Sequence, residues 1–213
     1  MPQVQNLKVY QGFEITEPDI YNAVDLIESV EPGWSEVYIK GLLEIFKHFK
    51  DPFIMVKNDE EPIGFFVVLV VEKFFISEWC AGKHNHEFLY LEFPDGTLLH
   101  PQPDTFLHVL IELIAIKPGW DTFAVMPIMM SKFAKYIQSL AAQNCFIEKV
   151  YSEAFSKKGQ RLASFFGLEK VRDTEYGTLY ASGSTPEKFT RLFPADFQKL
   201  NELYAQKFNT YKF

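Results

Sequence analysis

The most informative part of the sequence runs from Thr105 to Leu168. It contains FLHVLIELIAIKPGW (106–120), the amphipathic MMSKFAKYIQSLAA (129–142), CFIEKVYSEAF (145–155) and GQRLASFFGL (159–168). The nearly continuous apolar run 106–116 is typical of a strand that is covered on both faces. In the amphipathic segment, the apolar residues recur at the i, i+3, i+4 and i+7 positions of one buried helix face. The stretch therefore predicts strand, helix, strand and helix, with a further strand from Leu168.

The flanking segments extend this alternation of strands and helices. Thr16-Glu17-Pro18-Asp19 resembles a capping box with proline in the first turn, which predicts a helix start. Ser156 is a predicted N-cap and Gly167 a predicted helix stop. The remaining expected strands are 7–15, 53–57, 63–76, 168–171 and 177–181. The remaining expected helices lie over 38–49 and from Pro127. We also expect a helical tail from 185, with Phe197, Leu200, Tyr204 and Phe208 on one face. The segment 82–103 predicts an extra hairpin or a long excursion beside the main sheet.

Composition indicates one sizeable core in a soluble chain. The sequence has 213 residues, of which 47% are hydrophobic and 23% charged, and the excess of 28 acidic over 21 basic side chains gives a net charge of −7. This charge disfavours nucleic acid as a partner. No apolar run approaches the roughly 18 residues of a membrane span, so we expect a cytoplasmic protein with no membrane partner. Cys80 and Cys145 are far apart and without metal-type spacing, which predicts reduced thiols.

Taken in order, these elements resemble the GNAT acyltransferase superfamily. The strongest motif is Arg161-Leu162 followed by Phe166-Gly167-Leu168, which resembles that family's fourth helix entering its sixth strand. The second is Ile116-Lys117-Pro118 at the end of the fourth strand. The resemblance implies an α/β (α+β) fold with a mixed, mainly antiparallel central sheet and helices on both faces. It implies a GNAT-like domain over 1–183 with an insertion at 82–103, and a C-terminal helical extension over 184–213.

The resemblance also implies acyl transfer from acetyl-CoA or another acyl-CoA to an amine. In the family, the splayed fourth and fifth strands hold the pantetheine arm and the next helix N-terminus holds the pyrophosphate. The corresponding cofactor-binding residues here are Leu113, Ile114, Ala115, Ile116, Phe123, Ala124, Val125 and Met126.

The expected phosphate loop departs from the family pattern. Residues 121–127 contain no glycine, and Asp121 stands where a basic or amide residue is expected. Two like charges about 4 Å apart repel by roughly 1 kcal/mol in water and about 4 kcal/mol at a partly screened surface. Lys117, Lys132 or Lys157 would have to compensate, and the alternative is that each is an ordinary surface lysine.

The catalytic positions are mixed as well. The tyrosine that many members use to protonate the leaving thiolate is replaced by Ala163. Glu112, four residues before Ile116, is where the family commonly places the group that accepts the amine proton, and burial among apolar neighbours would improve it as a base. The alternative is that Glu112 faces water or pairs with a lysine. Tyr151, with Ser152 beside it, is the candidate to replace the missing acid.

The histidines and cysteines indicate a functional site less strongly. His84-Asn85-His86-Glu87, with His100 and His108, has a spacing seen in metal sites, but two ligands make no site and we expect no metal. Cys145 as a nucleophile lacks an identifiable base.

Three functions stay open at this point. The first is an N-acyltransferase acting on a small-molecule or peptide amine, preferably cationic because the chain is acidic. The second is a catalytically degenerate GNAT-fold module that binds a ligand or a protein. The third is an assembly subunit, such as a homo-oligomer formed through the Phe-rich sheet and the tail.

Overall fold

The computed structural model describes residues 6–30, 32, 36–84, 90, 97–182 and 202–207. Its elements follow the predicted alternation of strands and helices. They are β1 (Leu7–Gln11), a 3-10 turn (Gly12–Glu14), α1 (Glu17–Val30), α2 (Glu36–His48), β2 (Phe53–Asn58), β3 (Glu61–Val71), α3 (Lys73–Cys80), β4 (Phe106–Ile116), α5 (Thr122–Ala142), β5 (Phe146–Ala154), α6 (Lys157–Phe165), β6 (Leu168–Asp173) and β7 (Thr178–Ser182).

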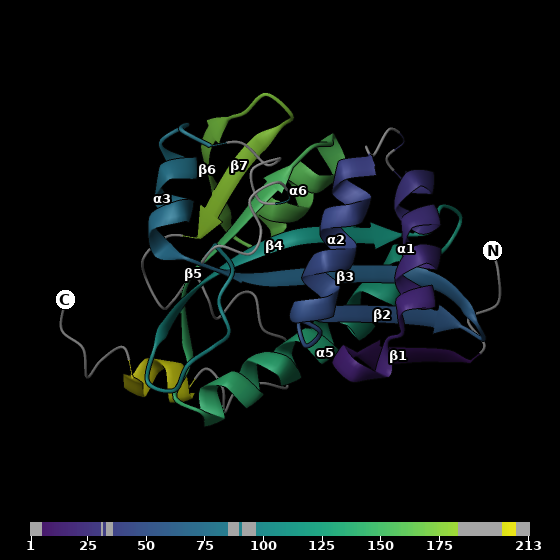
Figure 1. Cartoon of the computed structure of the whole chain (residues 1–213), viewed down its shortest axis with the longest axis horizontal. Helices are drawn as coiled ribbons and strands as arrows, with labels where there is room; N and C mark the ends of the chain where they lie inside the picture. The colour runs from purple at the N-terminus through teal and green to yellow at the C-terminus, as the bar shows by residue number, and fades with distance from the viewer. Residues whose placement is uncertain are drawn as a thin grey trace. The chain divides into compact units, whose positions relative to one another are not determined.

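The strands form one mixed sheet in the order β1-β2-β3-β4-β5-β7-β6 (Figure 1). The β1–β2, β2–β3, β5–β7 and β6–β7 pairs are antiparallel, and β4 and β5 are parallel. The predicted mixed, mainly antiparallel sheet is therefore confirmed. No helix among the described residues is long and apolar enough to cross a membrane.

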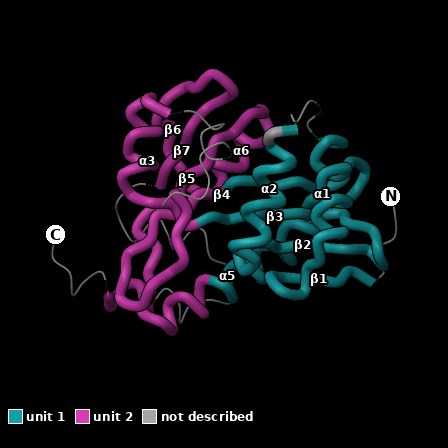
Figure 2. The backbone as a smooth tube through the Cα atoms, in the orientation of Figure 1, with its two compact units in different colours: residues 1–69, 87–95, 112–136 teal, residues 70–86, 96–111, 137–213 magenta. Residues whose placement is uncertain are grey.

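The chain divides into two compact units (Figure 2). Unit 1 consists of Met1–Leu69, Glu87–Asp95 and Glu112–Tyr136, and unit 2 of Val70–His86, Gly96–Ile111 and Ile137–Phe213. The second half of β4 and the first part of α5 thus belong to unit 1, together with β1, β2 and most of β3.

Aromatic contacts on both faces of β3 hold unit 1 together. Phe65 contacts Phe53 of β2 (ring centroids 6.0 Å apart), and Phe53 meets Phe46 of α2 edge-on at 5.1 Å. The next residue, Phe66, points to the opposite face and meets Phe133 of α5 at 5.2 Å. Because successive strand residues alternate between faces, helices α1 and α2 cover one side of these strands and α5 the other (Figure 1).

Gly64 lets α5 approach β3 closely. A Cβ atom at this position would lie 2.7 Å from Val125 Cγ1 and 3.2 Å from Met129 Sδ. The predicted buried face of α5 is confirmed over its length, since Met130, Phe133, Ala134, Ile137, Leu140 and Ala141 are all buried. The position of the α5 N-terminus in unit 1 therefore depends on a missing side chain in β3.

A buried ion pair connects α1 to β2. Lys57 Nζ lies 2.5 Å from Asp19 Oδ1, and both side chains are about nine-tenths buried. Asp19 Oδ2 also accepts hydrogen bonds from the Thr16 N–H and hydroxyl, so the predicted capping signal at the start of α1 is confirmed. Burial would raise the pKa of Asp19, but the hydrogen bonds from Lys57 and Thr16 outweigh it and lower the pKa.

In unit 2, β5 lies between β4 and β7. The Val150 N–H donates to Ser182 Oγ of β7 at 2.9 Å, and the Ile147 N–H donates to the hydroxyl of Tyr204 at 3.0 Å. Of the predicted tail face, only Tyr204 lies within the described residues, and it is buried.

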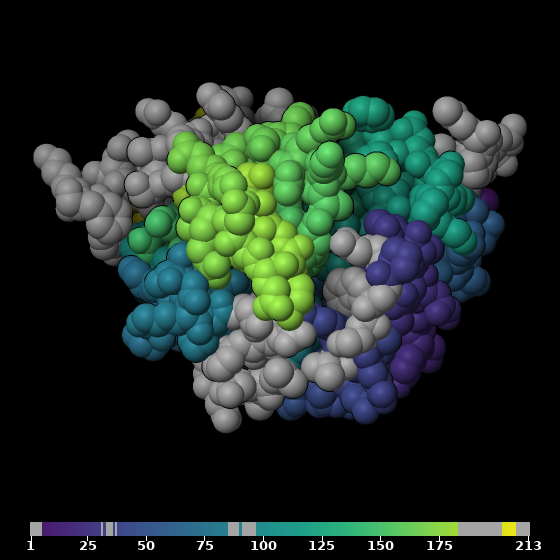
Figure 3. Space-filling model, turned by 90° about the horizontal axis from the view of Figure 1, so that it is seen from above, coloured from purple at the N-terminus to yellow at the C-terminus, as the bar shows by residue number. Residues whose placement is uncertain are grey.

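The yellow-green β6–β7 hairpin is visible at the surface in Figure 3, with α3 in blue beside it. Arg172 of this hairpin donates to the Trp79 carbonyl at the end of α3.

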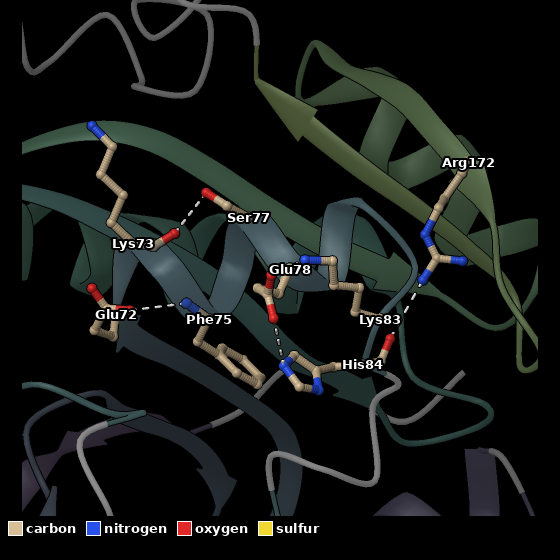
Figure 4. Close-up of polar contacts among 8 residues, drawn as sticks. All are labelled: Glu72, Lys73, Phe75, Ser77, Glu78, Lys83, His84 and Arg172. Carbon is tan, nitrogen blue, oxygen red and sulfur yellow. Dashed lines mark hydrogen bonds and ion pairs between the residues drawn. The ribbon is translucent and has the colours of Figure 1, made fainter.

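Two predicted boundaries are wrong. The strand expected over 63–76 ends at Val71, because the Glu72 carboxylate accepts the Phe75 N–H and starts α3 (Figure 4). The helix expected to open at Pro127 begins at Thr122 instead, with Asp121 as its cap. Pro127 lies inside α5, where it has no N–H to donate to the Phe123 carbonyl.

Two further segments are shorter than expected or only partly described. The strand expected over 7–15 ends at Gln11, where the 3-10 turn follows. Of the expected hairpin at 82–103, residues 85–89 and 91–96 lie outside the described residues, and Leu98 forms an isolated antiparallel bridge with Val71.

Asp19→Asn should destabilise the fold by about 3 kcal/mol or more, because the Lys57 ammonium would stay buried without its counter-charge. Urea unfolding measures the change in the free energy of unfolding. Asp25→Asn, on the exposed side of α1, removes the same charge and should change stability by less than about 0.5 kcal/mol. Equal stability of the two variants would contradict a structural role for the pair.

Candidate active site

Glu112 is buried in the second half of β4. Only 5% of its surface is exposed, so the alternative in which it faces water is wrong. Its Oε1 atom accepts a hydrogen bond from the hydroxyl of Tyr90. The structure thus places Glu112 inside the protein, four residues before the end of β4, and its role as a base stays a prediction.

Tyr90 is a site residue that the sequence pattern did not predict. It lies in the segment 82–103, far from Glu112 in sequence, and 6% of its surface is exposed. Gly41 of α2 makes room for it, since a Cβ at that position would lie 2.3 Å from Tyr90 Cδ1. Glycine inside a helix costs up to about 1 kcal/mol relative to alanine, so Gly41 was the available signal of a close approach. Burial and the Glu112 charge raise the pKa of Tyr90 well above its usual value.

The end of β4 leads into a helix start that is already capped. Asp121 Oδ1 accepts the Phe123 N–H at 2.9 Å. This contact places a carboxylate at the positive end of α5, where a phosphate would otherwise accept from main-chain N–H groups. Phe123 itself is 89% exposed.

The eight residues predicted to bind the cofactor all belong to unit 1. Ala115 and Val125 are buried, whereas Leu113, Ile114, Ile116, Ala124 and Met126 are half-buried and Phe123 is exposed. The parallel register of β4 with β5 runs from Phe106 opposite Phe146 to Ile111 opposite Ser152. Residues 112–116 of β4 therefore lie beyond the last register pair of these two fully described strands.

Two of the three lysines that were expected to offset Asp121 form ion pairs. Lys117 pairs with Glu61, and its N–H donates to the Ile63 carbonyl at 2.9 Å, which fixes the loop against β3. Lys132 Nζ lies 3.4 Å from Glu14 Oε2. Lys157, at the start of α6, is exposed in unit 2. Two of the three lysines expected to offset Asp121 thus already face a carboxylate.

Tyr151 lies in unit 2, where it is buried beside His108 in a polar cluster. Its hydroxyl is 3.0 Å from His108 Nδ1, and the two rings stack with centroids 5.9 Å apart. His108 Nε2 lies 3.2 Å from Glu148 Oε2, which in turn is 3.8 Å from Lys73 Nζ. Burial raises the pKa of Tyr151 and lowers the pKa of His108, although the Glu148 carboxylate opposes the second effect. Because Glu112 and Tyr151 belong to different units, their joint role stays a prediction.

The other candidate groups are held in structural contacts. His84 stacks on Phe75, and its Nε2 lies 3.6 Å from Glu78 Oε2 (Figure 4). Among the described residues, no cluster of His, Cys, Asp or Glu has the geometry of a metal site. Cys145 Sγ lies 3.0 Å from the Gln102 carbonyl, and burial raises the pKa of the thiol, which disfavours a nucleophilic thiolate. Neither Cys80 nor Cys145 forms a disulfide.

No protein-family model and no curated protein matches the sequence. The structure is similar to PH1933 from Pyrococcus horikoshii OT3, with a TM-score of 0.53 and 11% identity over 84% of this chain and 99% of that chain. It is also similar to a chain of the NatC complex bound to Gag peptide and CoA, with a TM-score of 0.50 and 11% identity over 85% of this chain and 100% of that chain.

At such low identity, likeness to solved structures shows the fold alone. Together with the order of the elements, it shows that this chain has the fold of the GNAT N-acetyltransferases, as the sequence predicts. The departures at Asp121 and Ala163 mark it as a divergent example of that fold.

His108→Gln should flatten the dependence of stability on pH. The pKa of His108 is lowered in the folded state, so below about pH 6.5 the unfolded chain binds a proton that the folded chain resists, and stability falls. Melting temperatures at about pH 5 and pH 8 should therefore differ less in the variant than in the wild type. His100→Gln, at an exposed position, should leave the difference unchanged. Equal differences in all three proteins would contradict this assignment.

Proposed function

We propose that this protein transfers an acetyl or longer acyl group from acyl-CoA to an amine of a small molecule or peptide. The observation that carries the proposal is the buried carboxylate of Glu112 near the end of β4 in a GNAT fold. A carboxylate there accepts the proton that an amine loses when it attacks a thioester carbonyl. The excess of acidic side chains, 28 against 21, favours a cationic acceptor.

The cofactor is proposed to lie along the second half of β4. The main chain of Leu113–Ile116 would bind the amides of the pantetheine arm, because these residues lie beyond the last register pair with β5. The first turn of α5, from Phe123 to Met126, would face the pyrophosphate. Coenzyme A supplies the activated thioester; the protein orients it and handles the protons.

The proposed chemistry is a direct transfer. The amine nitrogen attacks the thioester carbonyl, the C–N bond forms and the C–S bond breaks, and Glu112 takes the amine proton. Orienting the two reactants next to each other supplies much of the rate enhancement. Ala163 is buried in α6 and has no proton to give, so the departing thiolate needs another donor, for which Tyr151 is the candidate from the sequence.

A second candidate function is a catalytically degenerate module that keeps the GNAT fold for ligand or protein binding. The contact that favours it is the hydrogen bond from the Phe123 N–H to Asp121 Oδ1, since a capped helix start is a poorer anion site. The two candidates differ in whether an acyl-CoA binds and turns over.

Acetyl-CoA and longer acyl-CoAs should raise the melting temperature of the purified protein. A ligand at one hundred times its Kd adds about 2.7 kcal/mol of stability. Glu112→Gln should keep this shift and slow transfer by roughly a hundredfold to ten-thousandfold, whereas Glu169→Gln on the exposed side of β6 should leave turnover unchanged. The absence of a shift with every thioester would overturn the transferase proposal and favour the binding module.

Asp121→Asn should tighten acyl-CoA binding. Asparagine keeps a cap acceptor for the Phe123 N–H, while the variant loses the charge that repels the pyrophosphate. Removing about 1 kcal/mol of repulsion lowers Kd roughly fivefold by calorimetric titration at low salt. Asp25→Asn removes an equal charge from α1 and should have no such effect. Unchanged or weaker binding by Asp121→Asn would place the phosphates elsewhere.

A further inference from the structure

Acyl transfer leaves a thiolate that needs a proton, and the usual donor position cannot provide one. Ala163 carries only a methyl group and is 4% exposed. In unit 1, however, the Tyr90 hydroxyl makes a hydrogen bond to the carboxylate proposed as the base. This pair places a proton donor and a proton acceptor in direct contact.

We propose that Tyr90 and Glu112 act together as a proton relay, in which Glu112 accepts the proton of the amine and Tyr90 donates its own proton to the departing thiolate. This inference rests on the proposed N-acyltransferase function and adds a catalytic residue to it.

The position of the Tyr90 hydroxyl is fixed by packing on its ring. The ring lies against Gly41, where even a methyl group would come within 2.3 Å of Cδ1 and 2.8 Å of Cβ. On another side, Tyr38 meets it edge-on, with ring centroids 5.0 Å apart and an interplanar angle of 77°. A catalytic hydroxyl needs this kind of support, because small displacements from the productive geometry cost large factors in rate.

The relay balances without any further reactant. The C–N bond forms and the C–S bond breaks, the amine proton moves to Glu112, and the Tyr90 proton moves to sulfur. As the Tyr90 proton leaves, the proton on Glu112 passes in the same step to the Tyr90 oxygen along the existing hydrogen bond. The products are an amide and a thiol, and both side chains return to their starting states.

The electrostatics of the pair require the two transfers to be coupled. Burial and the adjacent Glu112 charge raise the pKa of Tyr90 well above its usual value, so a phenolate beside an ionised carboxylate is strongly disfavoured. Once Glu112 holds the amine proton, it becomes a donor to the Tyr90 oxygen, and the Tyr90 proton is released towards sulfur. Tyr90 is therefore an effective acid only after Glu112 has acted as the base.

Tyr90→Phe tests the relay, because it keeps the ring and removes only the hydroxyl. We expect kcat to fall by roughly a hundredfold to ten-thousandfold with little change in KM or in the acyl-CoA melting shift. Tyr21→Phe, which removes a hydroxyl from the exposed side of α1, should keep the wild-type kcat. The double variant Tyr90→Phe/Glu112→Gln should be no slower than Glu112→Gln alone, since the two groups act as one unit. Additive losses, or a wild-type rate for Tyr90→Phe, would overturn the relay.

Changing the leaving group distinguishes an acid from a group that merely supports Glu112. With an acyl thioester of a more acidic aryl thiol, the rate deficit of Tyr90→Phe should shrink to within about tenfold, because a weakly basic thiolate needs no proton. The deficit of Glu112→Gln should persist. An equal deficit of Tyr90→Phe with both thioesters would reduce Tyr90 to a structural role.

The wild-type protein gives a test that depends on no variant. Single-turnover rates in mixtures of H2O and D2O should curve with deuterium content, because two protons move in one step, and a linear dependence would contradict the relay. Failure of the proposed function has a different signature: no acyl-CoA would bind or turn over in the wild type. If the wild type binds and turns over acyl-CoA, and Glu112→Gln is much slower but Tyr90→Phe is not, then only the relay is contradicted.

Discussion

The contact between the Tyr90 hydroxyl and the Glu112 carboxylate is the constraint on which the candidate site depends. A carboxylate that is 5% exposed is costly unless a donor satisfies it, and the tyrosine hydroxyl provides that donor. The tyrosine can reach Glu112 only because α2 has a glycine at position 41. The contact thus depends on three residues: Gly41 on α2, Tyr90 from a distant segment and Glu112 on β4. Removing the Tyr90 hydroxyl takes a hydrogen-bond donor away from the buried Glu112 carboxylate.

A second close approach positions the other half of the site. Gly64 of β3 lets Val125 and Met129 pack directly on the strand, which sets where α5 begins relative to β4. The loop between β4 and α5 is tied down by Lys117, through its side-chain pair with Glu61 and its main-chain bond to Ile63. Asp121 then caps the helix from within the chain. The fold therefore places the N-terminus of α5 next to β4, but the Asp121 carboxylate already accepts a hydrogen bond there.

The sequence predicted best the elements whose signal is local. The run 106–116 matches β4 at both ends because a nearly continuous apolar run is typical of a strand covered on both faces. Ser156 caps α6 as expected by accepting the Gly159 N–H. The prediction failed at Glu72, where a single N-cap decides whether the following residues form a strand or a helix. Phe75 and Ile76 fit a buried strand as well as they fit a helix. The prediction placed Glu112 on the right strand but could not find Tyr90, because that contact joins segments far apart in sequence. The His108–Tyr151 contact was hidden for a similar reason: it depends on a parallel register that shifts between Leu107 and His108.

The divergent residues of the proposed cofactor site favour a ligand that is bound through its acyl end more than through its phosphates. An ordinary GNAT phosphate loop has glycines whose N–H groups surround the pyrophosphate, whereas here Asp121 already accepts one of these donors and Lys117 already faces Glu61. Micromolar affinity requires about 8 kcal/mol in total, so a ligand that gains little from its phosphates must gain more from elsewhere. The half-buried apolar residues Leu113, Ile114 and Ile116 offer contact area along the arm and the acyl group. Selectivity in such a site would depend on the acyl end of the thioester more than on its nucleotide end, because that is where the protein has apolar surface and a buried carboxylate.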